Sequence, residues 1–111
     1  MLTEWQAEVL ERLEKLDEQK HFSFNDYSLR GLASLLLARG SFVGFSTLVR
    51  FLIELRDFGV LRKSSTKPMN GQLLDYFVFN DKKAREFYWD RVGRSKVYLL
   101  GVERYDLKGE L

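Results

Sequence analysis

Residues 46–61 read STLVRFLIELRDFGVL, and the rest of the chain is organised around this segment. Leu48, Leu52 and Leu55 fall at i, i+4 and i+7, which is the spacing of one apolar face of an amphipathic helix. Gly59 follows the last periodic residue, in the place where a left-handed residue ends many helices. The residues after it have the apolar character of a strand. The segment therefore predicts a helix that ends at a glycine and continues directly into a strand.

Two further helices are predicted before this segment. Thr3 and Gln6 have the spacing of a capping box at the start of the first helix. Asn25 or Asp26 is predicted to cap the second helix, since short polar side chains accept hydrogen bonds from a helix N-terminus. Between the two helices, phenylalanine alternates with a polar residue over residues 22–24, which fits a short strand.

A hairpin is predicted after the segment. The first strand covers residues 60–65, and the second covers residues 73–80 with apolar residues on both faces. The connection over residues 66–72 contains Pro68 and an Asn-Gly pair, which are strong turn signals. One face of the second strand is expected to pack on the helices, so the other face needs a cover from the C-terminal third of the chain.

The central segment resembles the recognition helix and first wing strand of the winged helix-turn-helix family, which includes the MarR- and PadR-like regulators. In that family the helix reads roughly Ser-Thr-Val-x-Arg-x-Leu-x-x-Leu-x-x-x-Gly-Leu-Ile before it enters the strand. The resemblance covers residues 24–81. The positions of this chain that fill those slots are Ser46, Thr47, Leu48, Arg50, Leu52, Leu55, Gly59, Val60 and Leu61.

The resemblance implies an α+β, mainly helical fold in a single domain over residues 1–111. It would be a winged helix with a three-helix core, a two-stranded wing and a C-terminal extension of a helix and a strand. Residues 1–81 would form the core and wing, and residues 82–111 the extension, with its strand at 97–102. The second wing strand and this extension, at residues 87–89 and 97–102, carry more apolar residues than so short a chain buries easily. The extension is therefore a candidate dimerisation element, and we predict a homodimer.

Composition excludes several classes of protein. The chain has 111 residues, of which 45% are hydrophobic, so it is long enough for one small folded domain. It has no Cys and one His, so we expect no disulfide, no metal site, no cofactor and no enzymatic nucleophile–base pair. His21 is interpreted as a packing or loop residue. No apolar run reaches the roughly 20 residues of a membrane span and no signal peptide is visible, so we expect a cytoplasmic, intracellular protein.

The positive charge is concentrated in the middle of the chain. Residues 1–26 carry seven acids and three bases, for a net charge of −4. Residues 27–72 carry seven bases and two acids, for +5, and residues 73–111 carry eight bases and seven acids, for +1. A basic helix-turn-helix and wing would suit nucleic acid, whereas the alternative is that these charges are simply solvated.

The resemblance implies sequence-specific binding of double-stranded DNA by a transcriptional regulator. In this family the third helix enters the major groove and its first residues meet base edges. Ser46, Thr47 and Arg50 occupy those positions, and arginine pairs bidentately with guanine. The residues expected to contact phosphate or the minor groove are Arg39, Ser41, Lys63, Lys67 and Asn70.

Two other interpretations compete with DNA readout. Arg50 has the spacing for an ion pair with Glu54, one helical turn later. Such a pair would explain the presence of an arginine at this position without any contact to DNA. Val49 and Ile53 lie on the expected outward face of the same helix, where the family usually has polar residues. If they are exposed, the alternative is a winged-helix module that binds another protein without reading DNA.

Overall fold

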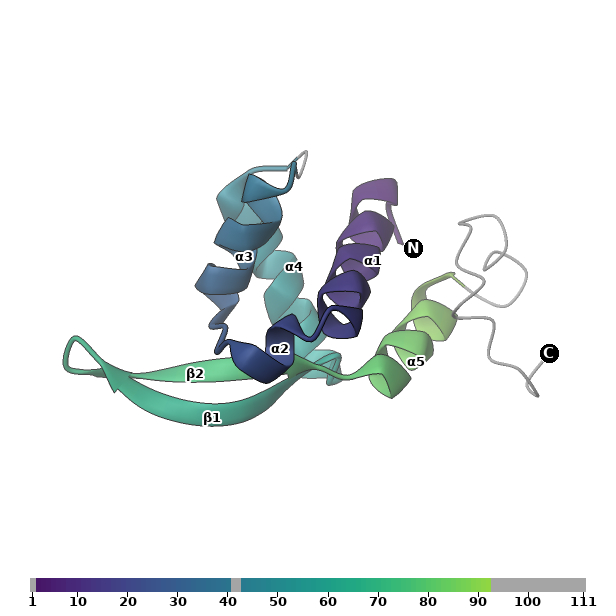
Figure 1. Cartoon of the computed structure of the whole chain (residues 1–111). Coiled ribbons are helices and arrows are strands. Elements are labelled where there is room, and N and C mark those ends of the chain that lie inside the picture. Colours follow the sequence, from purple (N-terminus) through teal and green to yellow (C-terminus); the bar gives the residue numbers. More distant parts are fainter. Residues whose placement is uncertain (1, 41–42, 93–111) are drawn as a thin grey trace.

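The computed structural model describes residues 2–40 and 43–92, which form five helices and a two-stranded antiparallel sheet (Figure 1). The architecture is therefore α+β and mainly helical, as predicted. Helices come first, a hairpin follows, and a last helix returns to the helical body. The elements are α1 (Glu4–Glu18), α2 (His21–Phe24), α3 (Leu29–Ala38), α4 (Phe45–Phe58), β1 (Leu61–Met69), β2 (Gln72–Phe79) and α5 (Asp81–Val92).

Helix α1 begins at the predicted capping box. The Thr3 hydroxyl accepts a hydrogen bond from the Gln6 backbone N–H at 3.3 Å, and the Gln6 side chain accepts one from the Thr3 N–H at 2.9 Å. Two backbone donors at the start of the helix are satisfied in this way. The apolar face of this helix is buried, with Leu10 and Leu13 completely inaccessible to solvent.

The segment between α1 and α3 differs from the prediction. Residues 21–24 form the one-turn helix α2 and not a strand, and the cap of α3 is Ser28 and not Asn25 or Asp26. The Ser28 hydroxyl accepts a hydrogen bond from the Gly31 N–H at 3.0 Å. Strand-like pairing occurs just before this cap, where the Tyr27 carbonyl accepts a 2.8 Å hydrogen bond from the Phe77 N–H of β2.

Helix α4 ends at Gly59 as predicted. Gly59 has a φ of +105°, and its N–H donates to the Arg56 carbonyl at 3.0 Å. The Val60 N–H donates to the Leu55 carbonyl at 2.8 Å, which completes a Schellman motif. Because this motif satisfies the last carbonyls of the helix within two residues, β1 starts immediately after it. The apolar face of the helix, including Leu48, Leu52 and Leu55, is fully buried.

Replacing Gly59 with valine is expected to destabilise the protein by about 1 kcal/mol or more, because a β-branched residue is strained at positive φ. A Cβ atom at this position would also lie 3.4 Å from Lys83 Cγ. Urea unfolding monitored by circular dichroism measures the loss. Gly59→Asn is the control, because asparagine tolerates the left-handed conformation better and should lose less. Equal stability of the valine variant and the wild type would contradict this end of the helix.

The hairpin is longer and its turn is tighter than predicted. The turn consists only of Asn70 and Gly71, whose φ values of +50° and +80° are those of a type I′ turn. The predicted connection over residues 66–72 is therefore wrong, because its outer residues extend the two strands. Pro68 lies within β1 opposite Leu73, which is tolerated since both strands of a two-stranded sheet are edges.

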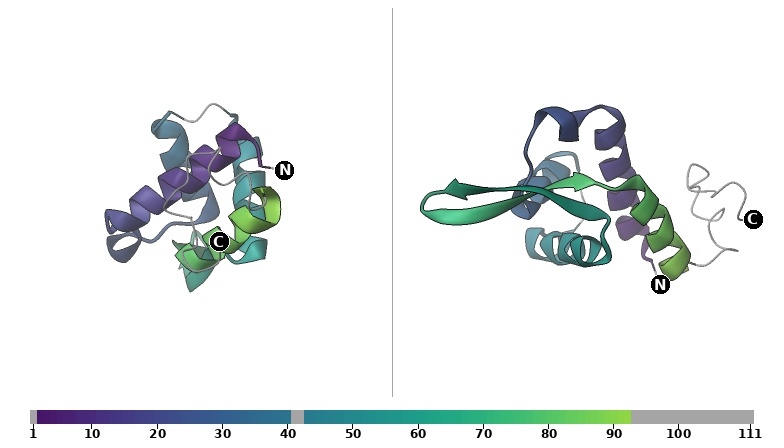
Figure 2. Two further views of the ribbon diagram at one scale, coloured as in Figure 1. Left: turned by 90° about the vertical axis from the view of Figure 1, so that its right-hand side faces the viewer. Right: turned by 90° about the horizontal axis from the view of Figure 1, so that it is seen from below.

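The hairpin projects from the helical body (Figure 1), and the right-hand view of Figure 2 shows this projection from below. Its base, where Phe77 and Phe79 are buried, belongs to the hydrophobic core. Its tip carries Met69 and Leu73, whose side chains are 54% and 76% exposed. The hairpin is therefore anchored at one end and open to solvent at the other.

Helix α5 packs onto the body through an aromatic cluster. Phe87 and Tyr88 are completely buried, and the Phe87 ring meets the Phe51 and Phe58 rings edge-on, with centroids 6.1 and 5.2 Å away. The Tyr88 hydroxyl donates to the Ala7 carbonyl of α1 at 3.2 Å. These two aromatic residues therefore fill the core of their own chain and are not available to a second copy. The strand predicted at 97–102 lies outside the described residues, and the homodimer stays a prediction.

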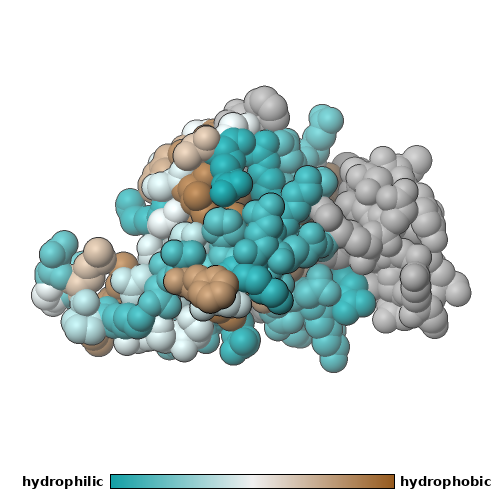
Figure 3. All heavy atoms as spheres, viewed as in Figure 1, coloured by the Kyte–Doolittle hydropathy of each residue, from teal (hydrophilic) through white to brown (hydrophobic). Residues whose placement is uncertain are grey.

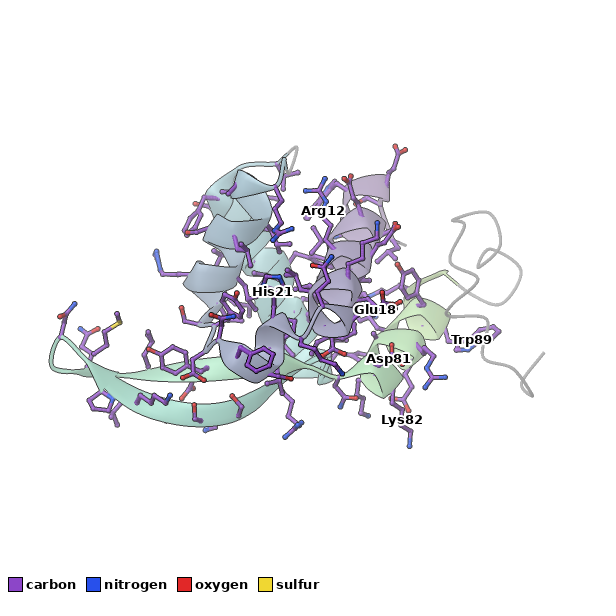
Figure 4. All side chains as sticks on the ribbon, in the orientation of Figure 1. Arg12, Glu18, His21, Asp81, Lys82 and Trp89 are labelled. Atoms are coloured by element: carbon purple, nitrogen blue, oxygen red, sulfur yellow. The ribbon has the colours of Figure 1, made fainter. Side chains whose placement is uncertain are left out.

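Acidic residues meet where α1 approaches α5. Burial raises the pKa of the Asp17 carboxyl, and Asp81 raises it further. Lys20 lowers this pKa and Glu18 raises it, both less strongly than burial does. Figure 4 shows Glu18 and Asp81 near this junction. The folded protein thus holds the Asp17 proton more tightly than the unfolded chain does.

Replacing Asp17 with asparagine is therefore expected to stabilise the protein at neutral pH. The gain should be small, on the order of 0.5 kcal/mol, because the site is near the surface. A folded pKa above the unfolded one means that wild-type stability rises as the pH falls through the folded value. The advantage of the variant should shrink over the same interval and vanish near pH 4, where the unfolded carboxyl also protonates. Thermal melts from pH 7 to pH 4 check this, and a constant advantage would contradict it.

Candidate nucleic-acid interface

The first two turns of α4 present three of the predicted site residues to solvent. Ser46, Thr47 and Arg50 are all exposed. Within residues 2–40 and 43–92, the Arg50 side chain forms no ion pair. The alternative pairing of Arg50 with Glu54 is wrong, because Glu54 binds Arg91 of α5 instead, with Nη2 and Nε at 2.9 and 3.2 Å. The Arg50 guanidinium is thus available to a partner.

The second half of the same helix has a different surface. A hollow of about 400 Å³ between α4 and α5 is lined by Arg50, Ile53, Glu54, Asp57, Phe58 and Arg91. The Arg91 guanidinium lies over the Phe87 ring, 4.6 Å from its centroid, and this stacking holds it beside Glu54. The two carboxylates of this hollow are both ion-paired, Glu54 with Arg91 and Asp57 with Arg56, so neither is paired with Arg50.

Val49 and Ile53 are only half-buried. Val49 packs against the hydrophobic core, so little of its side chain is offered to a partner. Ile53 lies in the hollow described above, next to Phe58. Over its described residues 45–58, this helix therefore has no broad exposed apolar face of the kind that would favour protein binding. Only the area around Ile53 remains as a candidate.

The three predicted residues of the hairpin occupy different settings. Lys63 is exposed near the base of the hairpin, and Asn70 is exposed in the turn. Lys67 forms an ion pair with Asp26, and its ammonium group also lies 5.6 Å from the centroid of the Tyr76 ring. This pairing ties the middle of the hairpin to the segment before α3 and shares the Lys67 charge with a carboxylate.

Of the remaining two predicted residues, the structure describes only Arg39. Arg39 ends α3, and its carbonyl accepts a hydrogen bond from Arg12 Nη1 at 2.6 Å. It lines a hollow of about 220 Å³ together with residues of α1, away from the hairpin. Ser41 lies outside the described residues. The structure therefore brings together Ser46, Thr47 and Arg50 on one helix, whereas Arg39 lines a hollow with residues of α1.

A basic concavity at the base of the hairpin contains residues that the sequence analysis did not select. Among the described residues, Arg56, Arg62, Lys63 and Lys83 line this open hollow of about 550 Å³. Only Lys63 belongs to the predicted site. The charge of +5 over residues 27–72 could have pointed to Arg56 and Arg62 as members of a basic surface. Lys83 lies outside that interval, so the charge distribution gave no reason to select it.

Apolar residues are scattered over the surface. Figure 3 shows brown patches over α2, over α3 and at the hairpin tip, and no continuous apolar surface on this face. The most exposed large apolar side chain is Phe24 of α2, at 82%. Such separated patches do not by themselves define an interface.

Other kinds of site find no support in the part of the chain that the structure describes. Residues 2–40 and 43–92 contain no group of three His, Cys, Asp or Glu side chains that could hold a metal ion. No helix among these residues is long and apolar enough to cross a membrane. His21 is half-buried on α2. Comparisons with protein-family models, with curated proteins and with solved structures found no match to this chain.

Proposed function

We propose that this chain is a winged helix that binds double-stranded DNA with sequence specificity and acts as a transcriptional regulator. The observation that carries the proposal is the exposed start of α4, where Ser46, Thr47 and Arg50 face solvent and Arg50 forms no ion pair with any residue that the structure describes. In a helix-turn-helix protein this is the part of the recognition helix that meets base edges. An arginine fork and two hydroxyl groups supply donors and acceptors for such readout.

The arrangement around α4 supports the same proposal. The α1–α3–α4 body would be the three-helix core, and the β1–β2 hairpin beside α4 would be the wing. Helix α3 packs on α4, and β1 leaves α4 directly at Gly59, so helix and hairpin share one side of the molecule. Residues 27–72, which include α4 and β1, carry a net charge of +5. A positive surface of this kind attracts the DNA backbone irrespective of sequence.

The second candidate is a winged-helix module that binds another protein. The observation that favours it is the hollow between α4 and α5, where Ile53 and Phe58 lie beside side chains of both charges. Mixed charge around apolar atoms suits a protein side chain better than a phosphate backbone. In this interpretation the start of α4 would not contact bases.

Titration of fluorescently labelled duplex DNA separates the two candidates. The wild-type protein should bind a duplex selected from a random pool more tightly than random DNA. Affinity for both should fall as salt rises, since bound phosphates release their counterions. If the protein binds neither duplex at low salt, DNA binding is excluded, and the hollow beside Ile53 becomes the candidate interface.

A further inference from the structure

The basic concavity is built from three elements that are separate in the sequence. Arg56 lies in the last turn of α4, Arg62 and Lys63 lie at the start of β1, and Lys83 lies in the first turn of α5. The tight turn at Gly59 brings the end of α4 next to β1. Lys83 lies close to that turn, because its side-chain carbons come within 3.4–3.6 Å of where a Gly59 Cβ would be. The concavity is thus fixed by the fold and does not depend on a mobile loop.

The charge of this concavity is partly compensated but stays positive. Of the residues that the structure describes, four basic ones and one acidic one, Asp75, line it. Arg56 pairs with Asp57 at 3.1 Å and Lys83 pairs with Glu86 at 3.1 Å, both near the surface. Arg62 and Lys63 form no ion pair within residues 2–40 and 43–92. Asp75 accepts a 2.7 Å hydrogen bond from the Thr66 hydroxyl, which takes part of its hydrogen-bonding capacity.

The size and position of the concavity fit a phosphate group. Its volume of about 550 Å³ lies within the usual range of small-molecule sites. It also lies at the end of α4 opposite to Ser46. A helix of 14 residues is about 21 Å long, whereas the major groove is about 12 Å wide. If α4 lies in the groove with its start on base edges and its axis close to the DNA surface, its far end reaches the phosphates that border the groove.

We propose that Arg56, Arg62, Lys63 and Lys83 form a phosphate-binding site at the base of the hairpin, separate from the base-reading start of α4. The phosphate is carried either by the DNA backbone or by a free phosphorylated small molecule. The first source rests on the proposed function, whereas the second does not. In both cases the arginine forks and ammonium groups bind phosphate oxygens through charge-assisted hydrogen bonds.

The test uses the double variant Lys63→Gln/Lys83→Gln, which removes two charges and keeps most of the side-chain length. Lys82→Gln is the matched control, because Lys82 is the exposed neighbour of Lys83 and does not line the concavity (Figure 4). The first measurement is a titration of the full chain with pyrophosphate at constant ionic strength, followed by ¹⁵N–¹H NMR. The second is duplex DNA binding at several salt concentrations. Thermal melts verify that each variant is folded.

For a free phosphorylated ligand, pyrophosphate should cause saturable shifts at Gly59, Arg62 and Lys83, and the double variant should bind it about tenfold more weakly or worse. For the DNA backbone, the double variant should bind all duplexes more weakly, and its slope of log K against log salt should fall by about 0.9 per lost contact. Lys82→Gln should resemble the wild type in both measurements.

The outcomes distinguish this site from the proposed function. If wild type binds DNA, yet the double variant keeps the wild-type salt slope and pyrophosphate causes no saturable shift, the phosphate site is wrong and the DNA proposal stands. If wild type binds no DNA but binds pyrophosphate at the concavity, the site stands and its ligand is a free phosphorylated molecule. If neither ligand binds, both proposals are wrong.

Discussion

Replacing Arg50 with alanine is expected to weaken binding to a specific duplex by about 1–3 kcal/mol, which is roughly 5- to 150-fold. The reason is that Arg50 is exposed on the second turn of α4 and keeps its guanidinium free of the neighbouring carboxylates. An arginine that binds guanine contributes binding energy mainly at the one base pair that contains this guanine. The preference for that base pair should therefore relax, while binding to random DNA changes much less. Competition titrations with single-base variants of the selected duplex measure both effects.

Two control variants show whether the loss of affinity in Arg50→Ala comes from lost base readout or from the lost charge. Arg50→Lys keeps the charge and loses the planar fork, so it should lose specificity nearly as far as the alanine variant. Arg85→Ala removes one positive charge from α5, where Arg85 pairs with Asp81 at 3.5 Å, and should leave specificity intact. If Arg50→Lys binds like the wild type, while Arg50→Ala and Arg85→Ala lose the same affinity for selected and random DNA, Arg50 acts through charge alone.

Replacing Phe87 with alanine is expected to destabilise the protein by about 3–5 kcal/mol, which is a large share of the stability of a small domain. Phe87 is fully buried and packs edge-on against Phe51 and Phe58, and it also supports the stacked Arg91. The variant leaves a cavity under α5 that the surrounding rings cannot fill completely. Urea unfolding followed by circular dichroism gives the free energy of unfolding.

Phe24→Ala is the matched control for this change. It deletes the same atoms from a side chain that is 82% exposed, so the free energy of unfolding should change by no more than about 0.5 kcal/mol. A loss of less than 1 kcal/mol in Phe87→Ala would contradict the packing of α5 and would return its aromatic residues to the list of candidate dimer contacts.

The features that could be predicted from sequence depend on neighbours along the chain. The capping box of Thr3 and Gln6, the glycine that ends α4 and the Asn-Gly turn each involve residues within a few positions of one another. The apolar stripe of α4 follows from its spacing alone. By contrast, α2 is too short to show a helical period. Asn25, Asp26 and Ser28 are all good caps, so local chemistry does not select Ser28.

The features that could not be predicted are created by contacts between distant residues. Lys67 meets Asp26 across 41 positions, so a lysine that was predicted to contact phosphate also forms an intramolecular ion pair. Glu54 meets Arg91 across 37 positions, and this pairing is what leaves Arg50 available. The basic concavity likewise needs the path of the chain to bring Lys83 beside Arg62. Such pairs of charges follow no local pattern, because only the tertiary fold determines which of many possible partners meet.

The hydrogen bond between Tyr88 and Ala7 joins residues that leave the ribosome far apart in time, since 81 positions separate them. A nascent chain that has emerged only as far as the hairpin already carries α1, α3 and α4. It nevertheless exposes Phe51 and the other apolar atoms that Phe87 and Tyr88 later cover. Exposed apolar surface of this kind makes a growing chain prone to aggregation. The domain can therefore complete its core only after α5 has emerged, and until then its exposed apolar surface favours aggregation.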